Sequence, residues 1–280
     1  GLVGSEMCIR DSQKSGKTIL GAEDGVNQSY CDLLFYVDAT PGSSIDDPER
    51  PSIPDEGDKE EPKPDEDENV TGTLAFEDIW PSGGDYDMND VIVEYERKVY
   101  FDKKNIVTKI VDEFTPVHDG ATYVNAFAYQ IDAAQIGDKI TLPEGAILEK
   151  ETSSIIVMSN AKQNIGNKYV VTREFNGSFL KNQLLSYNPY IIVKYSQGEQ
   201  NRTEVHLPKH KATAYANQSL IGSNDDAYYI DRKGAYPFAI DIPMLGFTPV
   251  TERNRIDSQY PGFATWAKSM GNDCKDWYKK

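Results

Sequence analysis

The segment Leu74-Ala-Phe-Glu-Asp-Ile-Trp-Pro-Ser-Gly-Gly-Asp-Tyr-Asp-Met-Asn-Asp-Val-Ile-Val-Glu-Tyr95 places an acidic turn between two apolar, strand-like ends. Oxygen side chains at alternate positions can converge on one point when the backbone curls around it. Hard oxygen ligands of this kind suit Ca²⁺, which takes six to eight of them. The segment therefore predicts a Ca²⁺ site, whose candidate ligands are Asp85, Asp87, Asn89, Asp90, Glu77 and Asp78.

The alternative for this segment is a solvated turn in which Asp and Asn side chains cap backbone amides. The pair Gly83-Gly84 frees the backbone to turn tightly, which suits either interpretation. The segment is not an EF-hand, because Asp90 stands at loop position six, where that motif requires glycine, and no flanking helices are predicted. A second acidic turn, Asn224-Asp225-Asp226, is predicted to be a plain turn, although a second or shared metal site stays open.

The remainder of the chain reads as short strands separated by turn signals such as Asp119-Gly120 and Asn176-Gly177. Runs of alternating or β-branched residues predict strands over residues 72–76, 90–100, 107–116, 123–131, 154–158, 169–175, 190–195 and 204–207. Apolar residues spaced as on one helix face, with a glycine after them, predict a helix from Phe263 to Met270. We therefore expect an all-β fold, an antiparallel β-sandwich or jelly roll with a short C-terminal helix.

The stretch between Asp46 and Asn69 holds twelve acidic residues, three basic residues and five prolines. It has too few apolar groups to offset the entropy of ordering, so it is predicted to be a disordered linker. The opening residues resemble a translated sequencing adapter and are set aside from fold reasoning. The predicted organisation is a non-native segment 1–12, a remnant of an upstream β domain 13–41, a linker 42–69 and a main domain 70–280.

The remnant is inferred from a faint internal repeat. Ile19 to Gly25 and the following strand-like run echo the Glu77-Asp78 element and the strand after it. Whether the remnant is separate or adds a strand to the main domain stays open.

The net charge of −16 without a basic stripe argues against nucleic-acid binding. No apolar run approaches the roughly 20 residues needed to cross a bilayer. A disulfide between Cys31 and Cys274 has no support beyond the presence of both residues. For His206 and His210, a surface or capping role is expected rather than zinc binding, because Pro208 lies between them and the flanking residues alternate like a strand.

The segment from Ala75 to Val93 resembles the opening signature of the LruC domain, which occurs on secreted and lipid-anchored surface proteins of Gram-negative bacteria, Bacteroidetes among them. The resemblance extends over residues 70–280 through Glu204-Val-His-Leu-Pro208, Ser219 to Asp226, Tyr236 to Pro243, Phe263-Ala-Thr-Trp-Ala267 and Asp276-Trp-Tyr-Lys279. The segment with Glu23-Asp24 and Asp32 to Val37 looks like the end of a related Asp-rich exported domain, often placed upstream. The resemblance implies an exported, mostly β, non-catalytic module, with a lipid anchor open and no defined substrate. Met88 departs from the pattern, which more often has an aromatic residue there.

Three functions follow as hypotheses. The first is a Ca²⁺-stabilised, non-catalytic interaction or structural module at the cell surface, with a protein or glycan ligand. The second is a carbohydrate-binding module, whose stacking platform would come from Tyr123, Phe127, Tyr129, Tyr187, Tyr190, Tyr195, Tyr228, Tyr229 and Tyr236. The third, a polysaccharide hydrolase, requires two facing carboxylates that the sequence does not single out.

Overall fold

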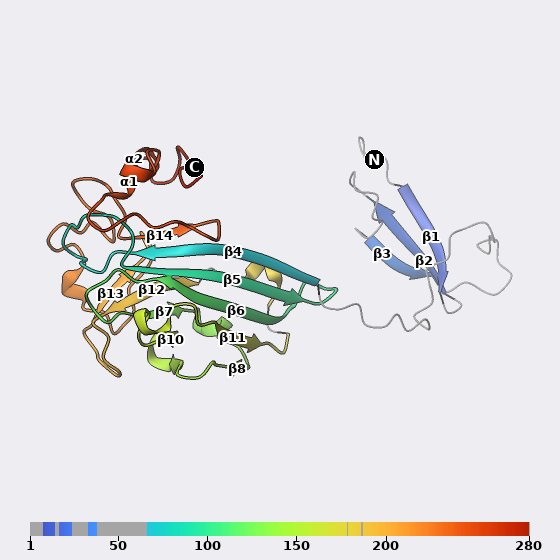
Figure 1. The fold of residues 1–280 in the computed structure, drawn as a ribbon. Coiled ribbons are helices and arrows are strands. Elements are labelled where there is room, and N and C mark those ends of the chain that lie inside the picture. The colour runs from blue at the N-terminus through green and yellow to red at the C-terminus, as the bar shows by residue number, and fades with distance from the viewer. Residues whose placement is uncertain are drawn as a thin grey trace. The chain divides into compact units, whose positions relative to one another are not determined.

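The computed structural model describes residues 8–14, 17–23, 33–37, 66–177, 179–185 and 187–279. The chain divides into two compact units, Gly1–Pro64 and Asp65–Lys280, each described by itself (Figure 1). Within the described ranges, every helix is too short or too polar to cross a membrane.

The described part of the first unit is a three-stranded antiparallel sheet in the order β1-β2-β3. Its strands are β1 (Cys8–Lys14), β2 (Lys17–Glu23) and β3 (Leu33–Val37). Strand β1 includes residues that the adapter resemblance set aside. Strand β1 pairs with β2, so residues expected to be non-native and residues of the predicted remnant share one sheet.

The second unit contains a six-stranded antiparallel sheet in the order β14-β4-β5-β6-β11-β8. Its strands are β4 (Glu66–Phe76), β5 (Val91–Phe101), β6 (Val107–His118), β8 (Lys139–Thr141), β11 (Tyr169–Glu174) and β14 (Ala239–Ile242). Alternate residues of β5 and β6 are buried, as expected for a sheet with one face on the core.

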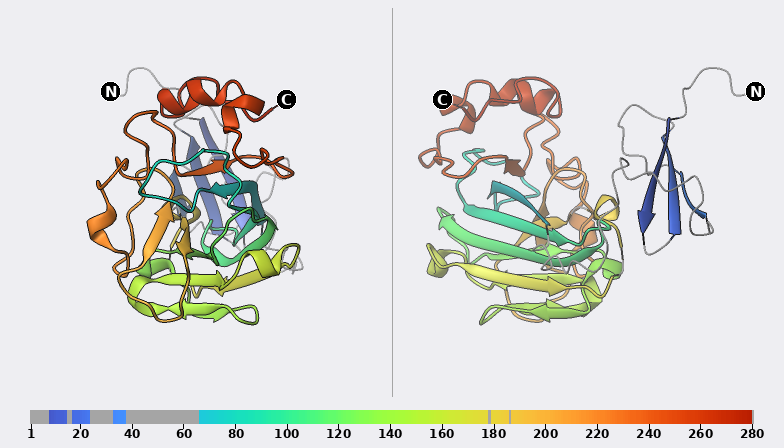
Figure 2. Two further views of the ribbon diagram at one scale, coloured as in Figure 1. Left: turned by 60° about the vertical axis from the view of Figure 1, so that its left-hand side comes forward. Right: turned by 90° about the vertical axis from the view of Figure 1, so that its right-hand side faces the viewer.

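A five-stranded antiparallel sheet in the order β13-β12-β7-β10-β9 forms the other layer (Figures 1 and 2). Its strands are β7 (Ala126–Gln130), β9 (Ile147–Glu149), β10 (Ser154–Met158), β12 (Asn188–Val193) and β13 (Thr203–His206). The sheets share one core, in which the Phe127 ring lies 5.1 Å from Phe114 and 6.3 Å from Phe76, centroid to centroid. The predicted antiparallel β-sandwich is thus confirmed.

A buried ionic group joins strands within this sandwich. Asp112 of β6 accepts hydrogen bonds from Arg97 of β5 (2.5 Å) and Arg173 of β11 (3.2 Å). The hydroxyl of Tyr129, on β7 of the facing sheet, donates to the same carboxylate at 3.1 Å. The group therefore ties three strands of one layer to the other layer.

Two short helices, α1 (Ile256–Gln259) and α2 (Phe263–Lys268), follow the last strand. The predicted C-terminal helix is confirmed, but it ends two residues before Met270, which is 65% exposed rather than part of the core. Five short 3₁₀ turns complete the described elements: η1 (Ala133–Gln135), η2 (Lys150–Thr152), η3 (Lys162–Asn164), η4 (Lys181–Gln183) and η5 (Gln218–Leu220).

All eight predicted strands of the main domain are present; β10 has the predicted bounds, and the others have ends shifted from the predicted ones. Strand β4 begins at Glu66, inside the range expected to be linker. The sequence missed β8, β9 and β14, which have only three or four residues and too little alternation to be recognised. The predicted linker upstream of Glu66 lies outside the described residues.

Candidate metal centre

The acidic segment forms the loop between β4 and β5, two neighbouring antiparallel strands. Both loop ends are fixed by the core, since Phe76 and Val91 are fully buried. The loop leaves β4 with the backbone N–H of Glu77 donating to the Phe238 carbonyl at 2.9 Å. The acidic residues therefore start from a rigid base.

Three carboxylates converge inside this loop. One oxygen each from Glu77, Asp85 and Asp87 lies within 4.8 Å of the other two. A shared Ca²⁺ at 2.3–2.6 Å from each ligand oxygen permits oxygens up to about 5 Å apart. The spacing fits one cation between the three groups, with backbone carbonyls or water supplying further oxygens.

The backbone of the loop turns at non-glycine residues as well as at its glycines. Tyr86 and Met88 have left-handed φ values of 55° and 54° and alternate with Asp85 and Asp87. Both side chains are buried, and the Tyr86 ring lies 5.6 Å from the ring of Phe238. Packing of Tyr86 and Met88 into the core thus holds the strained turn that brings the two aspartates together.

Gly84 allows the loop to close on itself, as the sequence predicted. A Cβ atom at this position would come within 2.5 Å of the Ile79 side chain and 3.2 Å of a Glu77 carboxylate oxygen. A larger residue would push against the candidate ligand group.

Without a cation, the charged forms of Glu77 and Asp87 are disfavoured. Burial and the charges of neighbouring carboxylates raise the pKa of Glu77 well above its ordinary value. The Met88 N–H donates to Glu77 and offsets part of this rise. Burial and the charge of Asp85 raise the pKa of Asp87 to about 6, although the Arg253 N–H donates to it. No lysine or arginine side chain is among the main influences on these two described groups.

Asp78 and Asp90 form a separate pair next to the three carboxylates. The Asp78 N–H donates to Asp90 Oδ2 at 2.7 Å, and the Asn125 amide donates to Asp78 Oδ2 at 2.8 Å. Burial and the Asp78 charge raise the pKa of Asp90 to about 7. Lys162 and Lys194 act on Asp78 as positive charges, so this pair has protein cations nearby.

The Asn89 side chain does not join the three carboxylates. Its side-chain N–H donates to the Val250 carbonyl at 3.0 Å, and its Oδ1 is so close to Gly120 that a Cβ there would lie 2.6 Å away. That Oδ1 is buried and accepts no hydrogen bond from a described residue. Of the six predicted ligands, the structure therefore groups three and places Asp78, Asp90 and Asn89 beside them.

The second acidic turn braces the loop. Asp225 accepts the Gly83 N–H on Oδ2 at 2.9 Å and pairs through Oδ1 with Lys233 at 2.8 Å. Asp226 is fully buried and accepts the Trp80 indole N–H at 2.9 Å, together with two backbone N–H groups. These bonds support the predicted plain turn.

A further brace had no signal in the sequence. The Arg253 N–H donates to Asp87 Oδ2 at 3.1 Å, and the Ile256 N–H donates to the Tyr86 carbonyl at 2.8 Å. Both donors are backbone groups, so residue identity gave no hint of them.

Two further sequence predictions concern the histidines and the cysteines. The predicted surface or capping role is wrong for His206, which is fully buried and bonded to Asn188 and Glu204 at 2.8 and 2.9 Å. Cys274 is a free, exposed thiol, while Cys31 lies outside the described residues.

Comparisons with known proteins agree with the fold. A family described as a domain of unknown function (DUF4842) matches residues 158–278. A crystal structure of a candidate lipoprotein from Bacteroides ovatus matches with a TM-score of 0.58 and 18% identity, over 76% of this chain and 74% of that one. At this identity the likeness shows the fold alone, and the chain has no match among curated proteins. Neither match indicates a catalytic family, and the LruC resemblance stays a prediction.

Proposed function

We propose that this chain is a Ca²⁺-stabilised, non-catalytic module of a protein at the surface of a Gram-negative bacterium. The observation that carries the proposal is the convergence of Glu77, Asp85 and Asp87 within 4.8 Å, in a loop braced from two distant segments. Two like charges about 4 Å apart repel by roughly 4 kcal/mol at an effective dielectric near 20. A bound divalent cation turns this repulsion into attraction.

The donor set favours Ca²⁺ over softer metals. All three groups are carboxylates, and neither a thiolate nor an imidazole belongs to the cluster. Extracellular modules commonly bind Ca²⁺ with Kd values around 10⁻⁴–10⁻³ M, so a modest site would be filled outside the cell. The acidic cluster thus fits an exported protein better than one in a Ca²⁺-poor interior.

The proposed location follows from the fold comparison. The Bacteroides ovatus protein of similar fold is described as a candidate lipoprotein, which agrees with an envelope location and a lipid anchor. The module itself would be structural or would bind a surface protein or glycan. The carbohydrate-binding alternative loses support, because five of its nine platform residues are buried: Phe127, Tyr129, Tyr190, Tyr229 and Tyr236.

Thermal unfolding of the full chain tests the metal site. In EDTA the melting temperature should be low, and saturating Ca²⁺ should raise it by about 5 to 10 °C, as expected for ligand at 100 times Kd. Mg²⁺ should give a smaller shift, because it binds reluctantly to all-protein sites.

The double variant Asp85→Asn, Asp87→Asn should lose the Ca²⁺ shift while keeping the fold. Asp273→Asn, an exposed aspartate after α2, is the matched control and should respond to Ca²⁺ as the wild type does. An equal Ca²⁺ shift in the double variant, or no shift in the wild type, would remove the proposal.

A further inference from the structure

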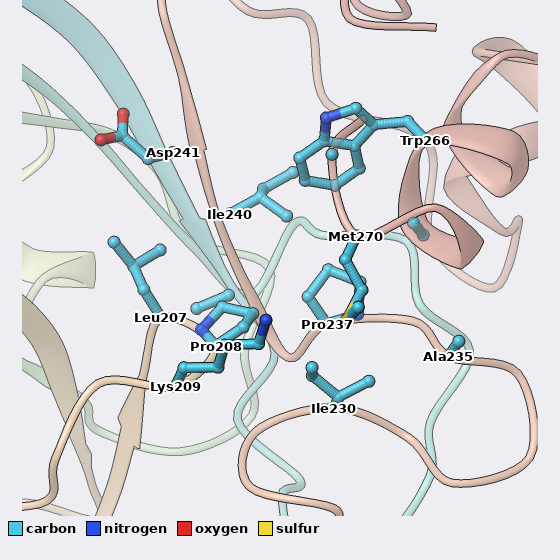
Figure 3. A pocket seen from close by; sticks show the side chains of 13 residues that line it. Leu207, Pro208, Lys209, Ile230, Ala235, Pro237, Ile240, Asp241, Trp266 and Met270 are labelled. Atoms are coloured by element: carbon cyan, nitrogen blue, oxygen red, sulfur yellow. The ribbon is translucent and has the colours of Figure 1, made fainter. Parts of the chain in front are cut away.

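A second feature of the domain is an apolar pocket of about 290 Å³. It lies between edge strand β14, the residues after edge strand β13, and the end of α2 (Figure 3). None of its lining residues belongs to the candidate metal centre. Its volume is near the lower end of the roughly 300–1,000 Å³ found for small-molecule sites.

The pocket lining is mostly hydrocarbon. Its main side chains are Leu207, Pro208, Ile230, Pro237, Ile240 and Trp266. A sugar placed here would direct hydroxyls at groups that cannot bond them, and each unmet hydroxyl costs about 1–3 kcal/mol. The lining therefore favours a compact alkyl or aryl group.

The end of α2 supplies an adaptable wall. Met270 follows the helix in a left-handed conformation (φ 52°) and keeps 65% of its surface exposed while lining the pocket. Its unbranched thioether can move to fit ligands of different shape and contacts aromatic rings favourably. The exposure of Met270 suits a binding surface rather than a closed core.

A single unpaired cation sets the charge of the pocket. Lys209 is exposed, forms no hydrogen bond or ion pair with a described residue, and extends toward the other lining residues in Figure 3. The other charged lining residue, Asp241, has its carboxylate turned away in the same view and accepts the Tyr95 hydroxyl at 3.0 Å. The free charge facing a ligand is therefore positive.

We propose that this pocket binds a compact alkyl or aryl group that carries a carboxylate. The hydrocarbon part fills the space between Trp266, Ile240 and Pro237, and the carboxylate pairs with the Lys209 ammonium. Two sources share this chemistry, a free carboxylic acid and the C-terminal residue of a peptide. The proposal is independent of the metal centre.

Methyl NMR of the full chain labelled with ¹³C-methyl methionine tests the pocket. The probes are 3-phenylpropionate, its neutral amide and the cationic 3-phenylpropylamine. We expect the acid to shift the Met270 methyl signal saturably and to bind about five- to tenfold more tightly than the amide, with the amine weakest. The peptide Gly-Gly-Phe with a free carboxylate, compared with its C-terminal amide, distinguishes a peptide source from a free acid.

The charge assignment is tested by Lys209→Gln, which should abolish the preference for acid over amide while binding of the amide is unchanged. Lys211→Gln is the control, since Lys211 is exposed in the same loop but does not line the pocket. Equal binding of acid and amide by the wild type, or a preference that survives in Lys209→Gln, overturns the proposal. So does the absence of any Met270 shift at about 20 mM probe, where even a site with millimolar Kd is occupied.

Discussion

Asp87 is one of the loop residues at which burial and nearby negative charges oppose ionisation. It is 2% exposed, near Asp85 and Glu77, and its partners are backbone N–H groups rather than a cationic side chain. In the absence of metal, the ionised form of this residue opposes folding. The same position is favourable once a cation is bound.

Asp87→Asn should therefore stabilise the protein without metal and destabilise it when Ca²⁺ is bound. Because the pKa of Asp87 is raised, its contribution to stability is lost as the pH rises through about 6, so at pH 8 its charge costs stability. In EDTA at pH 8, Asp87→Asn should raise the free energy of unfolding by on the order of 1–2 kcal/mol. In saturating Ca²⁺ the order should reverse, with the wild type more stable.

Urea unfolding in both conditions measures this reversal. Asn can still accept the Arg253 N–H, so the brace is preserved. Glu144→Gln, at an exposed site, should change neither value by more than about 0.5 kcal/mol. A destabilised Asp87→Asn protein in EDTA would show that the carboxylate has a purely structural role.

The sequence could predict the acidic residues of the candidate site, but not which of them converge and which bond to other groups. Glu77, Asp85 and Asp87 come together, while Asp78 and Asp90 bond to each other and Asn89 bonds to Val250. The direction of each side chain depends on the packing of Tyr86 and Met88 and on backbone donors far along the chain. Local spacing contains none of this information.

At the scale of elements, the buried group of Arg97, Asp112 and Arg173 links β5, β6 and β11. Burial alone would raise the pKa of Asp112, but the two guanidinium groups hold it below its usual range. Its contribution to stability is therefore present above about pH 4 and is lost as the pH falls through the lowered value.

Asp112→Asn should lower the free energy of unfolding by about 3–5 kcal/mol at pH 7, because it leaves two buried arginines without their counter-charge. The difference from the wild type should shrink below about pH 4, as the wild-type carboxylate becomes protonated. Urea unfolding from pH 7 to pH 3 measures both effects.

The neighbouring Glu113→Gln is the control for that substitution. Glu113 pairs with Lys168 at 2.6 Å near the surface, where the loss should be at most about 1 kcal/mol. If Asp112→Asn costs no more than this control, the buried group contributes little to stability.

The elements differ in how well the sequence predicted them. Strands with a long alternating pattern, such as β5 and β6, were predicted closely. The ion pair of Asp112 with Arg97 was not predicted. A charged residue in a strand is expected to face solvent, and only the pairing of β5 with β6 shows that these two residues meet inside the fold. Strand β14 was missed because pairing with β4, rather than its own pattern, makes it a strand.

At the scale of the whole molecule, the second unit closes through contacts between its ends. Gly83 bonds to Asp225 across 142 positions, Asp87 to Arg253 across 166, and Thr73 to Met244 across 171. Contacts at such separations form slowly, because much of the chain must be ordered first. The candidate metal centre is therefore complete only when nearly all of this unit has assembled.

This long-range bracing has a kinetic consequence. A cation that recognises only the finished loop stabilises the native state without stabilising the transition state for folding, so it should act on the unfolding rate. At 100 times Kd, Ca²⁺ should slow unfolding about a hundredfold and leave the folding rate nearly unchanged, as stopped-flow measurements in urea would reveal. An equal acceleration of folding would instead place the loop in the folding nucleus. On the predicted behaviour, Ca²⁺ determines how long the domain lasts once made, and hardly affects how quickly it is made.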